Sequence, residues 1–187
     1  MKRLLALALL IGTGLGSAVA LAQHKGSGSG AGSGSGSAAG KPYAGLDLRS
    51  VASFSDEDVA TMRAGRGMGF ALPAETNGYP GPMHILELAA ELDLSAAQRS
   101  AIDALFQRMQ SRARLAGDEY VKAEMALDAA FKAKTADTAT IARLTREADQ
   151  RRSEKRLSHL EAHIVARRIL NEAQLKRYAT LRGYEIK

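Results

Sequence analysis

The feature that most restricts the fold of this chain is an uninterrupted helical periodicity in its second half. From residue 102 to residue 131, apolar side chains recur at intervals of three and four, and no proline or cluster of turn residues occurs before about residue 134. The series consists of Ile102, Leu105, Phe106, Met109, Ala113, Ala116, Tyr120, Ala123, Leu127, Ala130 and Phe131. A helix of roughly 38 residues would be about 57 Å long, which is too long for a compact globule and typical of an extended hairpin.

A second long helix is predicted to return beside the first. Residues 135–138 form a turn, and helix-forming sequence continues to about Ile169, with Leu157, Leu160 and Ile164 on one face. Residues 149–156, DQRRSEKR, are instead polar on every side, which indicates a solvated segment or a surface to which something else binds. No alternating strand pattern occurs. The predicted fold class is therefore all-α, a long antiparallel helical hairpin with short flanking helices.

Two similar sequences each predict the start of a helix. Ser95 is followed three residues later by Gln98, and Asn171 is followed in the same way by Gln174. In such a capping box, the first side chain accepts a hydrogen bond from the backbone N–H three residues on, and the glutamine reaches back to the cap residue. The first box begins the long helix, and the second begins a short last helix that Gly183 ends.

The first 42 residues are expected to lie outside this fold. Residues 1–22 have a basic start, an apolar run and a small-residue triplet, the pattern of a cleaved secretory signal. If the signal is not cleaved, it would anchor the protein to a membrane. Residues 23–42 are rich in Gly and Ser and predict a flexible linker. The chain has no cysteine, which excludes disulfides, a cysteine nucleophile and a thiolate metal site.

Residues 43–79 predict an irregular segment with one short helix capped by Ser55, ahead of a helical-hairpin domain of residues 80–187. The glycine-rich stretch of residues 63–70, RAGRGMGF, lacks the Lys and Ser or Thr of a phosphate-binding P-loop and follows no predicted strand. An ordered loop packed through its backbone is expected there instead. Pro82 is well placed at the start of a short helix over residues 82–92.

The two capping sequences, LDLSAAQ and RILNEAQ, resemble the repeated Leu-Thr-x-x-Gln motif of the Spy/CpxP-like periplasmic proteins, with Ser95 and Asn171 where Thr is usual. The sequence HLEAH before the second copy is similar to the heavy-metal-sensor and metal-resistance relatives of that family. The resemblance covers about residues 79–184. It implies an α-helical hairpin that forms an antiparallel dimer in the periplasm. Some members are chaperones that need no ATP, some inhibit stress responses, and some bind zinc, copper, nickel or cobalt through His, Met and carboxylate side chains.

His159 and His163 are the candidate metal ligands. They are four residues apart on a predicted helix, so both imidazoles project from one face and can share an ion. Two ligands are too few for a closed tetrahedral site, so a two-fold dimer or a neighbouring Glu or Met would have to complete it. His84, beside a predicted helix start, is a further candidate. The expected ion is Zn, Cu, Ni or Co, and no other cofactor is required.

The local charge leaves a structural role for the histidine pair open. Four cationic side chains lie within two helical turns of it: Arg152, Lys155, Arg156 and Arg167. A cation about 8 Å from a divalent ion costs roughly 4 kcal/mol at an effective dielectric near 20. The alternative interpretation is a pair of half-exposed histidines at the edge of the hairpin seam. Metal binding or sensing is the leading hypothesis because it assigns the function to particular residues.

A chaperone that needs no ATP is the alternative function. Without the signal, 24 Lys and Arg face 20 Asp and Glu, and many of the basic residues lie on the return helix. The predicted client-binding residues are Arg151, Arg152, Lys155, Arg156, Arg167 and Arg168. Such a face, next to apolar and Met side chains, would attract unfolded client proteins or an envelope-stress signalling partner. A solvated basic face would look the same in sequence.

The sequence argues against other classes of function. No Ser, His and acid arrangement and no glycine-flanked nucleophile occurs, so catalysis is not expected. Nucleic acid is not expected as a partner because no aromatic residues are interleaved with the basic ones. A homodimer is expected, because two long amphipathic helices bury only the strip between them and a second copy would cover the remainder.

Overall fold

The computed structural model describes residues 41–185. The predicted signal, residues 1–22, and the linker up to residue 40 lie outside the described residues. The described part is all-α, with no β-strand, as predicted. Its elements are a short 3₁₀-helix η1 (Leu46–Leu48), then α1 (Asp56–Arg63), α2 (Leu72–Glu75), α3 (Pro82–Glu87), α4 (Ala96–Lys132), α5 (Thr138–Ile169) and α6 (Glu172–Arg182). None of these helices is long and apolar enough to cross a membrane.

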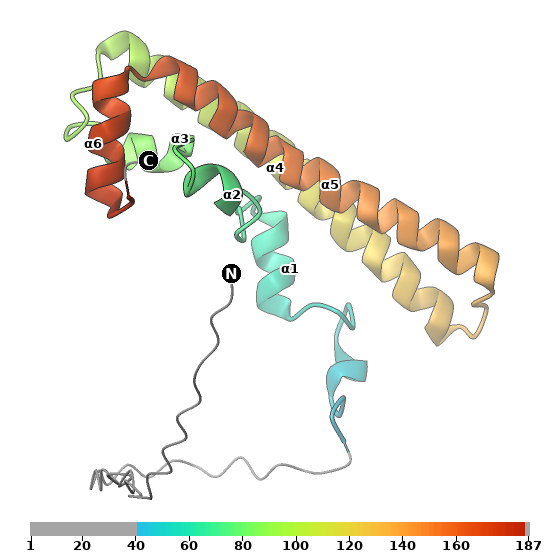
Figure 1. The fold of residues 1–187 in the computed structure, drawn as a ribbon. Helices are drawn as coiled ribbons and strands as arrows, with labels where there is room; N and C mark the ends of the chain where they lie inside the picture. The colour runs from blue at the N-terminus through green and yellow to red at the C-terminus, as the bar shows by residue number, and fades with distance from the viewer. Residues whose placement is uncertain (1–40, 186–187) are drawn as a thin grey trace, which may run out of the picture. The chain divides into compact units, whose positions relative to one another are not determined.

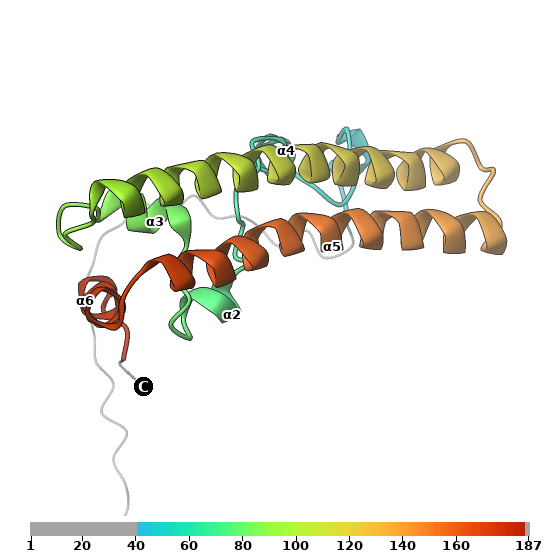
Figure 2. The same cartoon turned by 90° about the horizontal axis from the view of Figure 1, so that it is seen from above.

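Helices α4 and α5 form the predicted antiparallel hairpin and run side by side over their length (Figures 1 and 2). Both predicted capping boxes are present. The Ser95 hydroxyl accepts from the backbone N–H of Gln98 at 3.2 Å, and Asn171 Oδ1 accepts from that of Gln174 at 2.8 Å. The two boxes also meet, because Gln98 Nε2 donates to Gln174 Oε1 at 2.8 Å. This contact links the start of α4 to the start of α6.

Two apolar clusters hold the structure together. One lies at the open end of the hairpin, where α3, α4, α5 and α6 meet, and consists of Ile85, Leu92, Ile102, Leu105, Met109, Ala162, Ala166, Leu170 and Tyr178. The other lies further along the hairpin under the segment that precedes α2, and consists of Val51, Val59, Met62, Tyr120, Val121, Ala123 and Ala148. Within the periodic apolar series on α4, the members from Ile102 to Ala123 are buried except Phe106, which is partly buried, whereas Phe131 near the turn is 57% exposed.

The segment before α3 folds back along one side of the hairpin (Figure 1). Helix α1 begins at a capping box, as predicted, in which the Ser55 hydroxyl accepts from the N–H of Asp58 at 3.1 Å. After α1, Gly65 takes a left-handed backbone with φ +70° and packs on Arg114 of α4. Lys155 Nζ donates to the carbonyl of Arg66 at 2.9 Å. The glycine-rich stretch is therefore an ordered loop packed through its backbone, as expected.

This packing explains the polar stretch of α5 and corrects several expectations. Lys155, predicted on the basic surface, is fully buried, because the loop after α1 covers it. Leu157 and Ile164, predicted on the packed face of α5, are 49% and 43% exposed. The buried face of that region consists of Lys155, Ser158, His159, Ala162, His163 and Ala166. Helix α3 is also shorter than predicted, since it ends at Glu87 and turns follow to Asp93, where φ is +48°.

Candidate functional site

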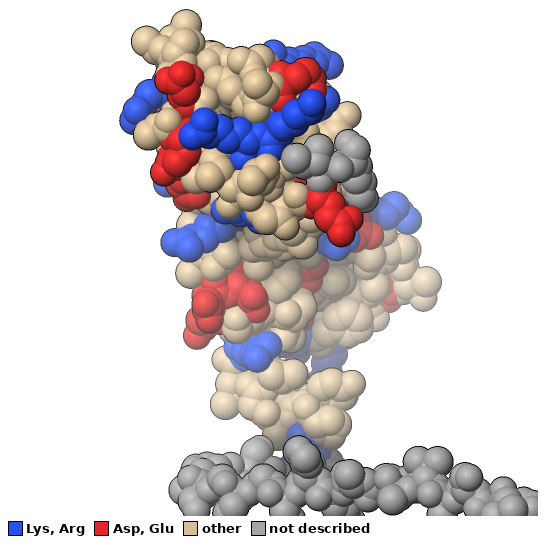
Figure 3. Space-filling view, turned by 60° about the vertical axis from the view of Figure 1, so that its left-hand side comes forward, with Lys and Arg blue, Asp and Glu red and all other residues tan. Residues whose placement is uncertain are grey.

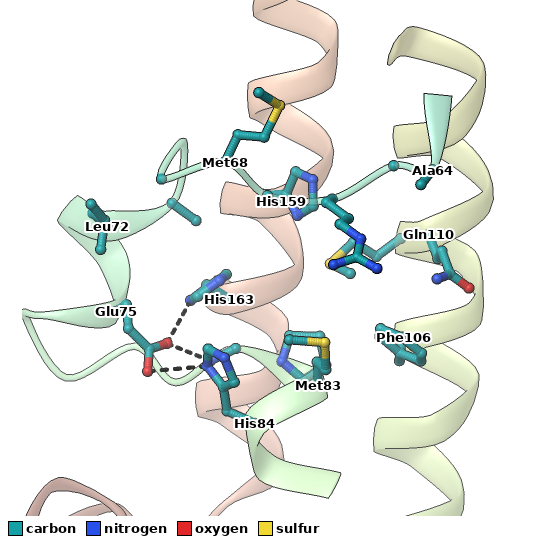
Figure 4. Close-up of a pocket in the computed structure, with 18 of the residues that line it drawn as sticks. Ala64, Met68, Leu72, Glu75, Met83, His84, Phe106, Gln110, His159 and His163 are labelled. Carbon is teal, nitrogen blue, oxygen red and sulfur yellow. Dashed lines mark hydrogen bonds and ion pairs between the residues drawn. The ribbon is translucent and has the colours of Figure 1, made fainter. Parts of the chain in front are cut away.

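The three histidines of the described chain face one cavity of about 610 Å³ between the hairpin and the segment before it. Its walls are the loop of residues 64–69, α2, α3, and the facing sides of α4 and α5. Figure 4 shows His159 at one end, and Glu75, His163 and His84 together at the other. Residues far apart in sequence thus meet at this cavity, and two of the three histidines are the predicted helical pair.

His163 is held in a defined tautomer. Its Nδ1 lies 2.6 Å from the backbone carbonyl oxygen of Tyr79. Because a carbonyl oxygen can only accept, Nδ1 carries a proton, and in the neutral ring the lone pair is on Nε2. A backbone carbonyl that fixes one ring nitrogen in this way is the usual outer partner of a metal-ligating histidine. Nε2 lies beside Gly81, where a Cβ atom would stand only 3.0 Å away.

His159 is buried without a partner for one of its ring nitrogens. Its side chain is only 5% exposed, and Nε2 makes no hydrogen bond. Burial, and next the nearby charge of Lys155, lowers the pKa of His159 to about 4, so the imidazole is neutral at pH 7. A buried polar atom without a hydrogen bond costs stability, and such atoms are uncommon in folded proteins. This nitrogen is therefore available to a ligand in the cavity.

Glu75 connects the cavity to the end of the chain. Its Oε1 accepts hydrogen bonds from the hydroxyl groups of Tyr178 and Tyr184, and its Oε2 accepts from the N–H of Gly81 at 3.0 Å. His84 Nδ1 lies 3.4 Å from Oε1, and His163 Nδ1 lies 3.7 Å from Oε2. Burial alone would raise the pKa of this carboxyl group, but the contacts with His84, Tyr178 and Gly81 outweigh it and lower the pKa to about 2.

The structure brings the predicted ligands His159, His163 and His84 to one cavity, but it corrects their setting. The helical pair is buried under the preceding segment, not half-exposed at the seam. Among the described residues, no group of three or more His, Cys, Asp or Glu side chains is arranged to hold a metal ion. Glu75 was not predicted, because nothing in its local sequence distinguishes it from a solvated acid.

The predicted client-binding residues do not form one free basic surface. Lys155 is buried, Arg151 pairs with Glu154 at 3.1 Å, and Arg167 pairs with Glu172 at 3.5 Å. Arg152 stacks over Phe70, whereas Arg156 and Arg168 are exposed. On the face in Figure 3, basic and acidic side chains are interspersed. A mixed, solvated surface fits these contacts better than a dedicated basic patch does.

Replacement of His159 by phenylalanine is expected to raise the stability of the ligand-free protein. The change removes a buried nitrogen that has no partner, so the free energy of unfolding should rise by on the order of 1 kcal/mol. The matched variant His163→Phe should lower it, because it breaks the hydrogen bond to Tyr79. Chemical denaturation of both variants measures the difference. A loss of stability in His159→Phe equal to that in His163→Phe would contradict the assignment of a free nitrogen.

Comparison with known proteins adds one match. A family model described as LTXXQ motif family protein matches residues 81–182, which is more than half of the chain and includes both capping boxes, α3 and the whole hairpin. No curated protein and no solved structure matches.

Proposed function

This chain belongs to the LTXXQ motif family, the family of Spy/CpxP-like periplasmic proteins, and from that premise we propose that it binds a transition-metal ion. The proposed ligands are the imidazoles of His159 and His163, with His84 at the same cavity. The proposed role is resistance to, or sensing of, the metal in the periplasm, without catalysis. Members of the family are typically periplasmic and non-enzymatic, which supports this setting.

The state of the two neighbouring imidazoles is the observation that carries this proposal. Both lie on one face of α5 and line one cavity. Tyr79 engages Nδ1 of His163, so Nε2 is the ring nitrogen left to a ligand, and the buried Nε2 of His159 makes no hydrogen bond. A neutral imidazole nitrogen is a ligand that Zn, Cu and Ni accept. The pKa of about 4 for His159 means that a metal would not have to displace a proton at neutral pH.

Isothermal titration of the purified protein with Zn, Cu, Ni and Co ions tests the proposal. Micromolar or tighter binding is expected for at least one ion, and the double variant His159→Ala/His163→Ala should lose it. Glu161→Gln is the matched control, because Glu161 lies between the two histidines in sequence but is exposed and pairs with Arg112. Absence of binding, or binding that the double variant retains, would refute the proposal.

Replacement of Gly81 by alanine is expected to weaken metal binding without removing a ligand. A Cβ atom at Gly81 would lie 2.9 Å from Cε1 and 3.0 Å from Nε2 of His163, so the ring must shift. We expect the affinity to fall by about tenfold, as for the loss of an outer-shell partner. Gly67→Ala is the control, because its Cβ would meet His159 at an ordinary 3.7 Å. Equal affinities of the two variants in the same titration would contradict this expectation.

A holdase-type chaperone is a second candidate, favoured by an exposed apolar stripe on the hairpin. Leu115 of α4 is 67% exposed and borders a groove with Leu157 of α5, and Ile164 and Val165 are exposed further along α5. Charged side chains also line this groove: Arg112, Glu119, Arg151 and Glu154. Apolar groups in such a row are available to unfolded chains or to a second copy of the protein. The predicted homodimer is therefore proposed to form at this surface, with unfolded client proteins or an envelope-stress signalling partner as the other candidates.

Two measurements separate these uses of the stripe. Light scattering coupled to size exclusion reports the dimer, and suppression of the aggregation of a reduced, unfolded test protein reports holdase activity. The double variant Leu115→Ser/Leu157→Ser should lose whichever property the stripe provides. If the wild-type protein is monomeric and does not suppress aggregation, neither use holds.

A further inference from the structure

The cavity collects thioether groups as well as imidazoles. Three of the chain's six methionines and three of its four histidines line it: Met68, Met83, Met109, His84, His159 and His163. The methionines come from three separate parts of the chain, namely the loop after α1, helix α3 and helix α4. The periodicity of a single helix therefore does not explain why they meet.

Core packing does not account for this set of methionines. Met109 is buried, but Met68 and Met83 are 38% and 45% exposed. Figure 4 shows Met68 near His159 at one end of the cavity, and Met83 toward the other end, between His84 and Phe106. Methionine side chains have three rotatable bonds, which lets their sulfurs adapt to a bound ion.

Resting on the metal-binding function proposed above, we propose that the cavity binds monovalent copper, held by the imidazole of His159 and by the thioethers of Met68, Met83 and Met109. Thioether sulfur is a soft ligand that selects Cu(I) over harder divalent ions, and imidazole nitrogen accepts copper as well. Thioether sulfur and imidazole nitrogen are both neutral donors, and His159 Nε2 is buried without a hydrogen-bond partner. Cu(I) accepts few and neutral ligands, so it does not need a carboxylate.

The carboxylate nearest the cavity is already engaged. Glu75 accepts hydrogen bonds from the N–H of Gly81 and from the hydroxyl groups of Tyr178 and Tyr184. A divalent ion that took this carboxylate as a ligand would have to compete with those donors. The cavity donors that make no hydrogen bond include His159 Nε2 and the methionine sulfurs, and the sulfurs are soft ligands.

The surrounding charges also favour a monovalent ion. Arg66 and Arg114 line the cavity, and Lys155 lies one helical turn before His159 on α5. The Coulomb energy between an ion and a fixed charge is proportional to the charge of the ion, so these cations repel Cu(I) half as strongly as a divalent ion at the same position. Cationic neighbours that oppose a zinc or nickel site therefore oppose a Cu(I) site less.

Competition for Cu(I) tests this inference. The purified protein is titrated without oxygen against Cu(I) held by a chromogenic chelator, and separately against Zn, Ni and Co ions by calorimetry. Wild-type protein is expected to withdraw Cu(I) from the chelator. The triple variant Met68→Leu/Met83→Leu/Met109→Leu conserves side-chain volume. It should lower the Cu(I) affinity by at least about tenfold, because the loss of an outer-shell partner already lowers metal affinity by that factor.

Controls and a direct readout make the outcomes distinct. Met125→Leu, an exposed methionine elsewhere on α4, should leave the Cu(I) affinity unchanged. X-ray absorption of the copper-loaded protein should show sulfur neighbours that the triple variant lacks, and circular dichroism confirms that the variant is folded. Unchanged Cu(I) affinity in the triple variant would overturn the inference, as would binding of Zn, Ni or Co without Cu(I). The latter result leaves the metal-binding proposal standing, whereas binding of no ion refutes both.

Discussion

Replacement of Gly117 by alanine is expected to displace α1 from the hairpin and to lower the free energy of unfolding by about 3 kcal/mol. A Cβ atom at Gly117 would lie 2.8 Å from the carbonyl carbon of Met62 and would overlap its oxygen. The contact is with backbone at the end of α1, so no side-chain rotation relieves it. In an ordinary helix interior the same change stabilises by about 0.5–1 kcal/mol, so the predicted effect has the opposite sign.

Chemical denaturation and limited proteolysis measure this effect together. Displacement of α1 exposes Val59 and Met62 and the loop that covers Lys155, so residues 41–80 should be cleaved faster in Gly117→Ala than in the wild type. Ser111→Ala, at an exposed position of the same helix, should stay within about 0.5 kcal/mol of the wild type. A Gly117→Ala variant that is more stable than the wild type would show that α1 does not pack as described.

The hairpin could be predicted because its signals are local. The period of α4, the turn before Thr138 and the two capping boxes each depend on residues within a few positions of one another. The family match to residues 81–182 agrees with that part of the prediction. The covering segment could not be predicted in the same way, because the contacts that hold it join distant positions. Lys155 and the carbonyl of Arg66 are 89 residues apart.

The candidate site could be predicted only in part, for the same reason. The spacing of His159 and His163 predicted that both lie on one helical face. Hydrophobicity alone, however, predicted Leu157 and Ile164 on the packed face of α5, and both are exposed. The histidines are buried because residues 64–82 pack over them. The periodicity of α5 carries no information about this packing. The one sequence signal for this cover was the polar stretch of residues 149–156, which predicted a surface to which something else binds.

Replacement of Glu75 by glutamine is expected to lower the free energy of unfolding of the metal-free protein by about 3 kcal/mol at pH 7, as for removal of one partner from a buried charged network. If the amide oxygen takes the place of Oε1, it accepts from both tyrosines, but the NH₂ group then faces the N–H of Gly81, which is also a donor. In the opposite orientation the oxygen accepts from Gly81 and the two hydroxyl groups lose their acceptor. Glu87→Gln, at an exposed position on α3, is the control and should have little effect.

The pH dependence of this difference identifies the carboxylate as its source. The pKa of Glu75 is lowered from 4.5 to about 2 in the folded protein, so the folded state favours the ionised form. Its contribution to stability, on the order of 3 kcal/mol, is fully present above pH 4.5 and is lost as the pH falls from there toward 2. Other acids with lowered pKa values, such as Asp58 and Asp137, act equally in both proteins and cancel in the comparison.

Denaturation of the wild type and Glu75→Gln at several pH values should therefore show free energies of unfolding that differ at pH 7 and converge near pH 2. A difference that stays constant down to pH 2 would mean that the network depends on the shape of the Glu75 side chain and not on its charge.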